Sequence, residues 1–140
     1  MTKKPVVIQI HDKYKDKTLE WFEYPYIGPN NPMVAPGEGF PCYKGKLFTG
    51  TIEWFDEEGI IETRERLKEG YEHGQQEIYY KGQLSEIRDF KNGELHGVCE
   101  YFDKDGNLDM KMIYKNDELI KTQSWEEGNL IYTWENESND

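Results

Sequence analysis

Three glycines at nearly equal spacing constrain this chain more than any other feature. Gly50, Gly74 and Gly97 are separated by 24 and then 23 residues, and each begins a segment of the form G-x-x-E followed by an apolar and an aromatic residue. Self-similarity at a fixed period is typical of repeat architectures, in which each unit packs on its neighbours. The chain is therefore expected to be built from repeated units.

Each repeat continues as strand, turn and strand. A second run of alternating residues follows each first strand, at Ile61–Leu67, Leu84–Phe90 and Leu108–Tyr114, and a similar run spans Leu119–Trp125. Turn sequences such as Asn92-Gly93 separate these runs, and such turns require positive φ. We therefore predict an all-β fold of antiparallel hairpins in one elongated twisted sheet. The repeats would occupy residues 43–117, and a terminal half-repeat and cap would occupy residues 118–140.

Residues 1–42 lie outside the repeat. Val6–Ile10 and Thr18–Tyr24 are expected to be strands that belong to the same domain as the repeats. Residues 25–41 hold five of the six prolines and three glycines, which predicts a long irregular loop. Long loops in small domains are often functional. The alternative is a surface excursion that caps the first hairpin, and the sequence does not decide between the two.

The stretch YYKGQLSEIRDFKNGELHGVCEYFDKDGNLDMKMIYKND, residues 79–117, resembles a variant of the MORN repeat, and residues 48–70 carry a weaker copy. Asp117 departs from the pattern, because it stands where the unit usually closes with glycine. The resemblance implies a MORN-like array with an N-terminal β/loop cap. Many proteins of this kind are bacterial antitoxins or immunity proteins, so the resemblance also implies that function.

The net charge of −11 belongs entirely to the repeat half. Residues 1–42 hold five acids and five lysines, whereas residues 43–140 hold 23 acids and 12 bases. Such a field repels nucleic acid and anionic membranes and attracts basic proteins. The apolar run Pro5–Ile10 is too short for a signal peptide, so a cytoplasmic location is expected. Cys42 and Cys99 are then expected to be free, buried thiols.

The sequence predicts neither an enzyme nor a metal or cofactor site. His73 and His96 each precede a repeat glycine, and Thr49 has the equivalent place in the first unit. Residues in one column of successive repeats are better explained as turn residues than as catalytic groups. No metal-ligand spacing and no nucleophile motif is present in the sequence.

A column of glutamates is the best candidate for a binding site. Glu53, Glu77 and Glu100 share one repeat position, and strand alternation places them on one sheet face. They are either solvated strand positions or part of a docking surface for a basic partner. The complete predicted surface adds the rings two residues later and the acids of the adjoining turns: Phe55, Asp56, Glu57, Glu58, Tyr79, Phe102, Asp103 and Asp105.

These features favour an immunity protein that neutralises a cognate toxin acting in the cytosol. A basic toxin such as a nuclease would suit the acidic surface, which could block its substrate groove without any chemistry. The charges near the chain ends favour a monomer that forms a heterodimer with the toxin. Two alternatives stay open, namely a non-catalytic MORN scaffold for other proteins and a phage-type acidic inhibitor that mimics nucleic acid.

Overall fold

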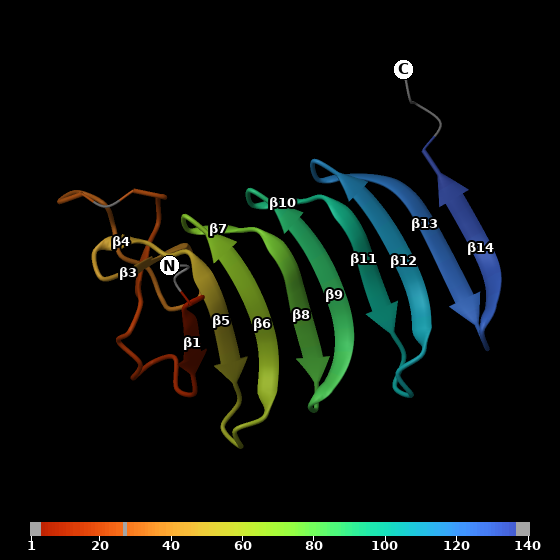
Figure 1. Cartoon of the computed structure of the whole chain (residues 1–140), viewed down its shortest axis with the longest axis horizontal. Coiled ribbons are helices and arrows are strands. Elements are labelled where there is room, and N and C mark those ends of the chain that lie inside the picture. The colour runs from red at the N-terminus through yellow and green to blue at the C-terminus, as the bar shows by residue number, and fades with distance from the viewer. Residues whose placement is uncertain (1–3, 27, 137–140) are drawn as a thin grey trace.

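The computed structural model describes residues 4–26 and 28–136, and it confirms the all-β hairpin array (Figure 1). Within these residues an elongated sheet of eleven strands contains a meander in chain order, preceded by β1 at one edge. The meander runs through β5 (Gly50–Phe55), β6 (Ile61–Lys68), β8 (Gly74–Tyr80), β9 (Gln83–Lys91), β11 (Gly97–Phe102), β12 (Leu108–Lys115), β13 (Glu118–Glu126) and β14 (Asn129–Glu135). The short strands β7 (Tyr71–Glu72) and β10 (Glu94–Leu95) extend the pairing of β6 and β9.

Two-residue turns with positive φ occur at both ends of the sheet. In the turn between β9 and β10, Asn92 has φ 50° and Gly93 has φ 85°. This is the backbone sign that type I′ hairpin turns require at both central positions, and it matches the right-handed twist of the flanking strands. Asn116 and Asp117 have φ 48° and 68°, so the aspartate adopts the conformation that glycine has elsewhere. The predicted turn chemistry is confirmed.

The histidines of the repeat tie successive turns together. Nδ1 of His73 accepts a hydrogen bond from the backbone N–H of Asn92 at 3.2 Å, and Nδ1 of His96 accepts one from Asn116 at 3.2 Å. The hydroxyl of Thr49 accepts the equivalent bond at 2.8 Å. Each side chain thus accepts a hydrogen bond from a backbone N–H of a turn about one repeat later in the chain. His73 and His96 themselves lie between two strands and support these turns from outside.

The N-terminal strand, whose pairing the sequence did not predict, adds a parallel edge to the antiparallel hairpin array. β1 (Val7–Ile10) pairs with β5 in parallel. Parallel neighbours cannot be joined by a tight turn, so the chain between them must cross over the sheet. The described residues of this crossover, 11–26 and 28–49, form a compact segment that we call the cap. It contains a small sheet of β2 (Glu20–Phe22), β3 (Phe40–Tyr43) and β4 (Lys46–Leu47). Because β3 continues through residue 42, the N-terminal part extends beyond the predicted boundary.

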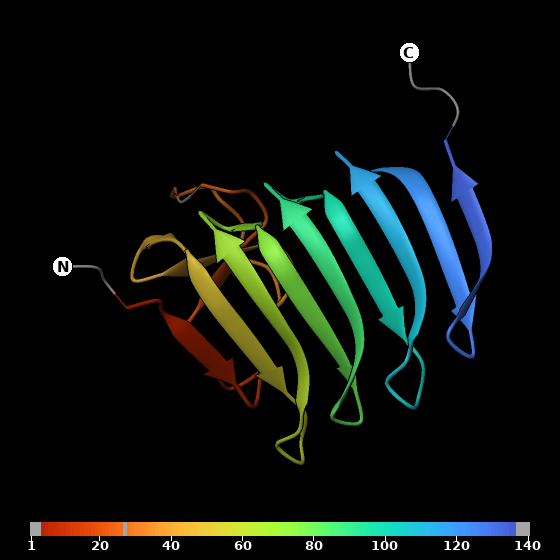
Figure 2. The ribbon, with the colours of Figure 1, turned by 45° about the vertical axis from the view of Figure 1, so that its right-hand side comes forward.

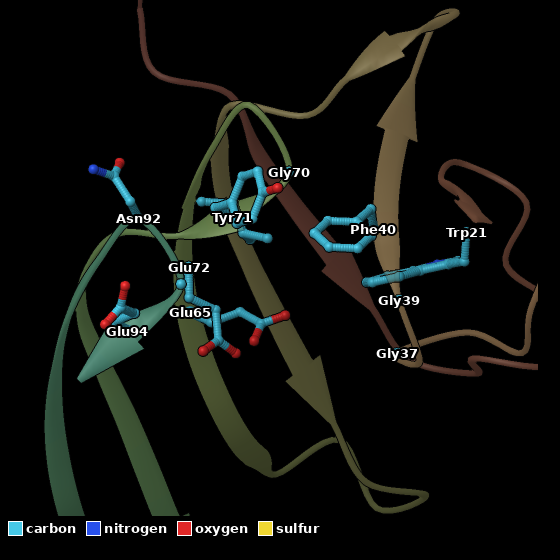
Figure 3. Close-up of a pocket in the computed structure, with 12 residues that line it drawn as sticks. Trp21, Gly37, Gly39, Phe40, Glu65, Gly70, Tyr71, Glu72, Asn92 and Glu94 are labelled. Atoms are coloured by element: carbon cyan, nitrogen blue, oxygen red, sulfur yellow. The ribbon is translucent and has the colours of Figure 1, made fainter. Parts of the chain in front are cut away.

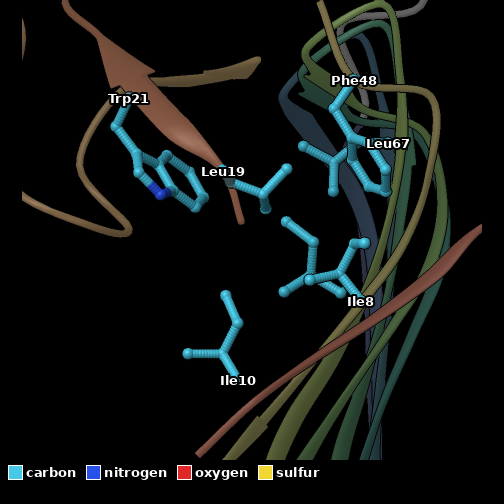
Figure 4. Close-up of a cluster of buried hydrophobic side chains, with 7 residues drawn as sticks. Ile8, Ile10, Leu19, Trp21, Phe48 and Leu67 are labelled. Carbon is cyan, nitrogen blue, oxygen red and sulfur yellow. The ribbon is translucent and has the colours of Figure 1, made fainter. Parts of the chain in front are cut away.

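The hydrophobic core lies between the cap and the first strands of the sheet (Figure 4). Leu19 and Trp21 from the cap pack with Ile52 and Leu67 from the sheet, and Phe48 is 2% exposed. Strands β11 to β14 lie beyond the cap (Figure 2). The core therefore stabilises one end of the array, while the other end depends on cross-strand pairs. Cys42 and Cys99 are free and buried, as predicted.

The register defines two faces of the long sheet. The cap face carries Ile52 and Trp54, together with Ile78 and Tyr101 farther along. The opposite surface, which we call the glutamate face, carries Glu53 and its equivalents. The structure of the described residues contains no helix long and apolar enough to cross a membrane.

Candidate functional site

The three glutamates of the repeat occupy a single row on the glutamate face. Glu53 lies opposite Arg64, which lies opposite Glu77. The row continues through Ile87 to Glu100, and Glu100 lies opposite Lys111 on β12. The structure thus brings the predicted residues together, but it alternates them with residues of opposite charge or no charge.

Two of these glutamates form ion pairs within the sheet. Glu53 Oε2 lies 2.7 Å from Arg64 Nε, and Glu77 Oε2 lies 2.8 Å from Arg66 Nη1. Their side chains are only 13% and 14% exposed. Hydrogen bonds from Gln9 and Arg64 lower the pKa of Glu53 below its usual range. These carboxylates are neither solvated strand positions nor free acidic groups. They hold neighbouring strands together.

The predicted rings lie at or near the C-terminal ends of β5, β8 and β11, at equivalent irregularities of register. The pairing shifts immediately before Phe55, Tyr79 and Phe102. Such bulges re-aim side chains at the end of a hairpin. Phe55 stacks on His11 with ring centroids 4.3 Å apart, and the hydroxyl of Tyr79 accepts a hydrogen bond from Arg64 at 3.0 Å. Phe55 and Tyr79 therefore contact different parts of the molecule.

The acidic residues that we predicted beside the glutamate column lie in two separate turns. Asp56 Oδ1 accepts hydrogen bonds from the backbone N–H groups of Glu58 and Ile60, both at 2.9 Å. Asp103 does the same for Asp105 and Asn107 in the turn between β11 and β12. Backbone hydrogen bonds, that from Asn107 first, lower the pKa of Asp103. Asp56 and Asp103 therefore have a structural role in their turns.

A cleft of about 1000 Å³ opens where the cap meets the cap face of β5, β6 and β8. We call it the acidic cleft. Among the described residues, its lining contains seven carboxylates and a single lysine, Lys13. The carboxylates are Asp12, Glu38, Asp56, Glu57, Glu62, Glu65 and Glu72. Rings of His11, Tyr14, Trp54 and Phe55 lie among them. Three of the predicted site residues, Phe55, Asp56 and Glu57, therefore belong to this cleft rather than to the glutamate face.

A smaller cavity of about 420 Å³ adjoins the acidic cleft and shares Gly37, Glu65 and Glu72 with it. We call it the aromatic pocket. Figure 3 shows Trp21 and Phe40 from the cap on one side and Tyr71 on the other, with the carboxylates of Glu65 and Glu72 below. The rings of Phe40 and Tyr71 meet edge to face at 5.1 Å. Rings and carboxylates together suit a cation that has an apolar stem.

Glu65 is the most perturbed carboxyl group of the site. Burial raises its pKa from the ordinary 4.5 to about 7; a hydrogen bond from Trp54 Nε1 at 3.2 Å opposes the rise, and the charge of Glu72 adds to it. Burial also raises the pKa of Glu72, whereas the charge of Arg88 lowers it. Perturbed carboxyls that line a cleft mark candidate functional sites. In its charged form, Glu65 would be stabilised by a cation entering the cleft.

A buried acceptor in the cleft also lacks a donor. Oε1 of Gln76 is buried and has no hydrogen-bond partner among the described residues. Leaving such a group unsatisfied costs about 1–3 kcal/mol. Gln76 and Glu65 both line the acidic cleft. The site therefore offers acceptors and negative charge, and a ligand that fits it must supply donors and positive charge.

Sequence reasoning missed Glu65 and Glu72, although a signal for Glu65 was present. Within the predicted strand Ile61–Leu67, alternation places Glu65 on the same side as Leu67, and the hairpin register places it opposite Ile52. A glutamate opposite a fully buried isoleucine is unusual, because ionised groups are rarely buried unless paired. For Glu72 there was no such signal, since its burial depends on the position of the cap.

The described residues contain no group of three or more His, Cys, Asp or Glu side chains that could hold a metal ion. Comparison with protein-family models, with curated proteins and with solved structures finds no match to this chain.

Proposed function

We propose that this protein is a non-catalytic immunity protein that binds a basic protein toxin in the cytosol and neutralises it. In this proposal a lysine or arginine side chain of the toxin enters the acidic cleft, and its apolar stem lies against the rings of the aromatic pocket. The observation that carries the proposal is the imbalance of the cleft lining, seven carboxylates against one lysine, together with the unpaired acceptor of Gln76.

The energetics favour a cationic ligand. Glu65 is costly to ionise in the free protein, because burial raises its pKa to about 7. A guanidinium or ammonium group beside it would lower that cost and would also donate to the orphan acceptor of Gln76. Excess negative charge around the cleft speeds the approach of a basic partner, so association should weaken as salt increases.

The acidic cleft fits this role better than the glutamate row does. Glu53 and Glu77 already bind Arg64 and Arg66, so a partner would have to displace these ion pairs before it could use the carboxylates. Replacing these glutamates with lysine would also place like charges together and destabilise the sheet. Such variants would not distinguish loss of binding from loss of fold.

A peptide titration tests the site without knowledge of the toxin. Hexa-arginine and hexa-glutamate peptides would be titrated into the full chain by calorimetry at pH 6 and pH 8. The proposal expects binding of the arginine peptide alone, tighter at pH 8 because Glu65 is then charged. The double variant Glu65→Gln/Glu72→Gln should weaken that binding by about tenfold or more, since each charge-assisted hydrogen bond contributes about 1.5–3 kcal/mol.

The matched control is Glu126→Gln/Glu127→Gln, which removes the same formal charge at the far end of the sheet. It should change affinity only slightly. Equal losses in the two double variants would mean that net charge alone attracts the peptide, and the cleft would not be the site.

The toxin-immunity function needs a biological test. The product of the gene beside this one would be expressed in bacteria with and without the chain, and growth would be measured. Rescue by the wild type and loss of rescue in the Glu65→Gln/Glu72→Gln variant support the proposal. Rescue that is unchanged in this folded variant would place the contact elsewhere.

A further inference from the structure

The last strand of the sheet has an uncovered edge. One side of β14 pairs with β13, and within the described residues no strand pairs with its other side. All seven residues of β14 are exposed, including Leu130 at 51%, Ile131 at 59% and Tyr132 at 53%. A long apolar edge strand presents a row of unpaired backbone groups, and such an edge is a template for another strand.

We infer that the occupant of this edge is β14 of a second copy of the chain. The two strands would pair in antiparallel orientation about a two-fold axis through Tyr132, continuing the antiparallel pattern of β12, β13 and β14. This interface is separate from the acidic cleft, which lies at the opposite end of the array. The inference therefore does not depend on the proposed function.

The sequence of β14 is self-complementary in this register. Leu130 lies opposite Trp134, Ile131 opposite Thr133 and Asn129 opposite Glu135, while Tyr132 faces its own copy. Aromatic pairs, such as Tyr132 with its copy, are among the cross-strand combinations that stabilise a sheet. No two like charges are directly opposed within the strand.

The single charged residue of this strand has a counter-ion in its own copy. Glu135 Oε1 lies 3.2 Å from Lys121 Nζ on β13, so a counter-ion for this carboxylate is present within each copy. The five residues from Leu130 to Trp134 carry no charge, in a chain whose residues are 32% charged. A basic partner strand would find no opposite charge along this run, whereas a second copy meets its own apolar residues.

The opposite edge of the sheet is a less suitable pairing partner for β14 than a second β14. β1 has only four residues, and pairing β14 with β1 of the next copy would repeat without closing. The two-fold arrangement instead covers the exposed β14 edge of each copy and forms a closed dimer. This departs from the monomer expected from sequence, because that expectation weighed the charges near the chain ends and not the neutral run between them.

Cross-linking tests the register directly. Tyr132→Cys should form a disulfide-linked dimer on mild oxidation, since the two cysteines would face each other across the axis; the native Cys42 and Cys99 are buried and should not interfere. Asn129→Cys is the matched control on the same strand. Its two copies would lie about 20 Å apart along the strand, so it should not cross-link.

Light scattering tests the association itself. The wild type should have twice the 16.6 kDa mass of the chain, and Ile131→Lys/Thr133→Lys should weaken the dimer by at least about tenfold because two lysine pairs then oppose each other. Val98→Lys, at an exposed apolar position inside the sheet, should leave the mass unchanged. A wild-type monomer at about 0.2 mM, open-ended oligomers, or a dimer in which Tyr132→Cys fails to cross-link would each overturn the inference.

Discussion

Replacing Glu65 with glutamine removes a carboxyl group from the wall of the acidic cleft and keeps the shape of the side chain. The oxygen of the new amide can still accept the hydrogen bond from Trp54 Nε1, which is 3.2 Å long in the wild type. The variant therefore isolates the effect of the charge. We expect glutamine at this position to stabilise the protein above pH 7 and to have a much smaller effect near pH 4.

The direction follows from proton binding. Burial raises the pKa of Glu65 from 4.5 to about 7, so between these values the folded protein holds a proton that the unfolded chain has released. Stability falls with pH wherever the folded state binds more protons. The contribution of Glu65 is thus neutral below pH 4.5, becomes unfavourable as pH rises toward 7 and is constant above it.

The pKa difference sets the magnitude. At about 1.36 kcal/mol per pH unit, the rise from 4.5 to about 7 limits the cost of the charged form to about 3 kcal/mol. Glu65 lines an open cleft and keeps some contact with solvent, so this figure is an upper bound. With a urea m-value of about 2 kcal/mol/M, the midpoint of unfolding would shift by up to about 1.5 M.

Urea unfolding followed by tryptophan fluorescence, at steps between pH 4 and pH 8.5, measures this difference. The curves of wild type and Glu65→Gln should diverge between pH 4.5 and 7 and then run parallel. Glu62→Gln, on the same strand with an exposed side chain, is the control and should follow the wild type. Parallel curves for wild type and Glu65→Gln over the whole range would refute the account of Glu65 as a buried carboxyl.

Three further predictions concern the fold. Phe48→Ala should lower the free energy of unfolding by about 3–5 kcal/mol, measured by urea unfolding, because this ring is 2% exposed at the centre of the core. His73→Ala should cost about 1 kcal/mol in the same assay, since the N–H of the next turn loses its acceptor. Gly70→Ala should lower the thermal midpoint more than Gly59→Ala: both have positive φ, but a Cβ at Gly70 would lie 2.9 Å from a leucine methyl of β4, whereas Gly59 faces open space. An unchanged free energy of unfolding in Phe48→Ala or in His73→Ala would contradict the structure. Equal thermal midpoints of the two glycine variants would contradict it as well.

The sequence determined the repeat, its strands and its turns. Positive φ at Asn92 and Gly93 follows from the residues themselves, because few others adopt that conformation without strain. The alternation that places Glu53 and Glu77 on one face follows from the two-residue period of a strand. These features depend on residues that are close along the chain, so a single sequence contains the information.

Tertiary structure decided what those residues do. The pairing of Glu53 with Arg64 needs only the register of one hairpin, but its hydrogen bond from Gln9 joins residues 44 positions apart and depends on the parallel placement of β1. The acidic cleft likewise exists only because an irregular segment packs against the sheet and buries Glu65 and Glu72. Alternation and turn chemistry act over a few residues, whereas the path of the cap results from the packing of its apolar side chains on Ile52 and Leu67. No local pattern encodes that path.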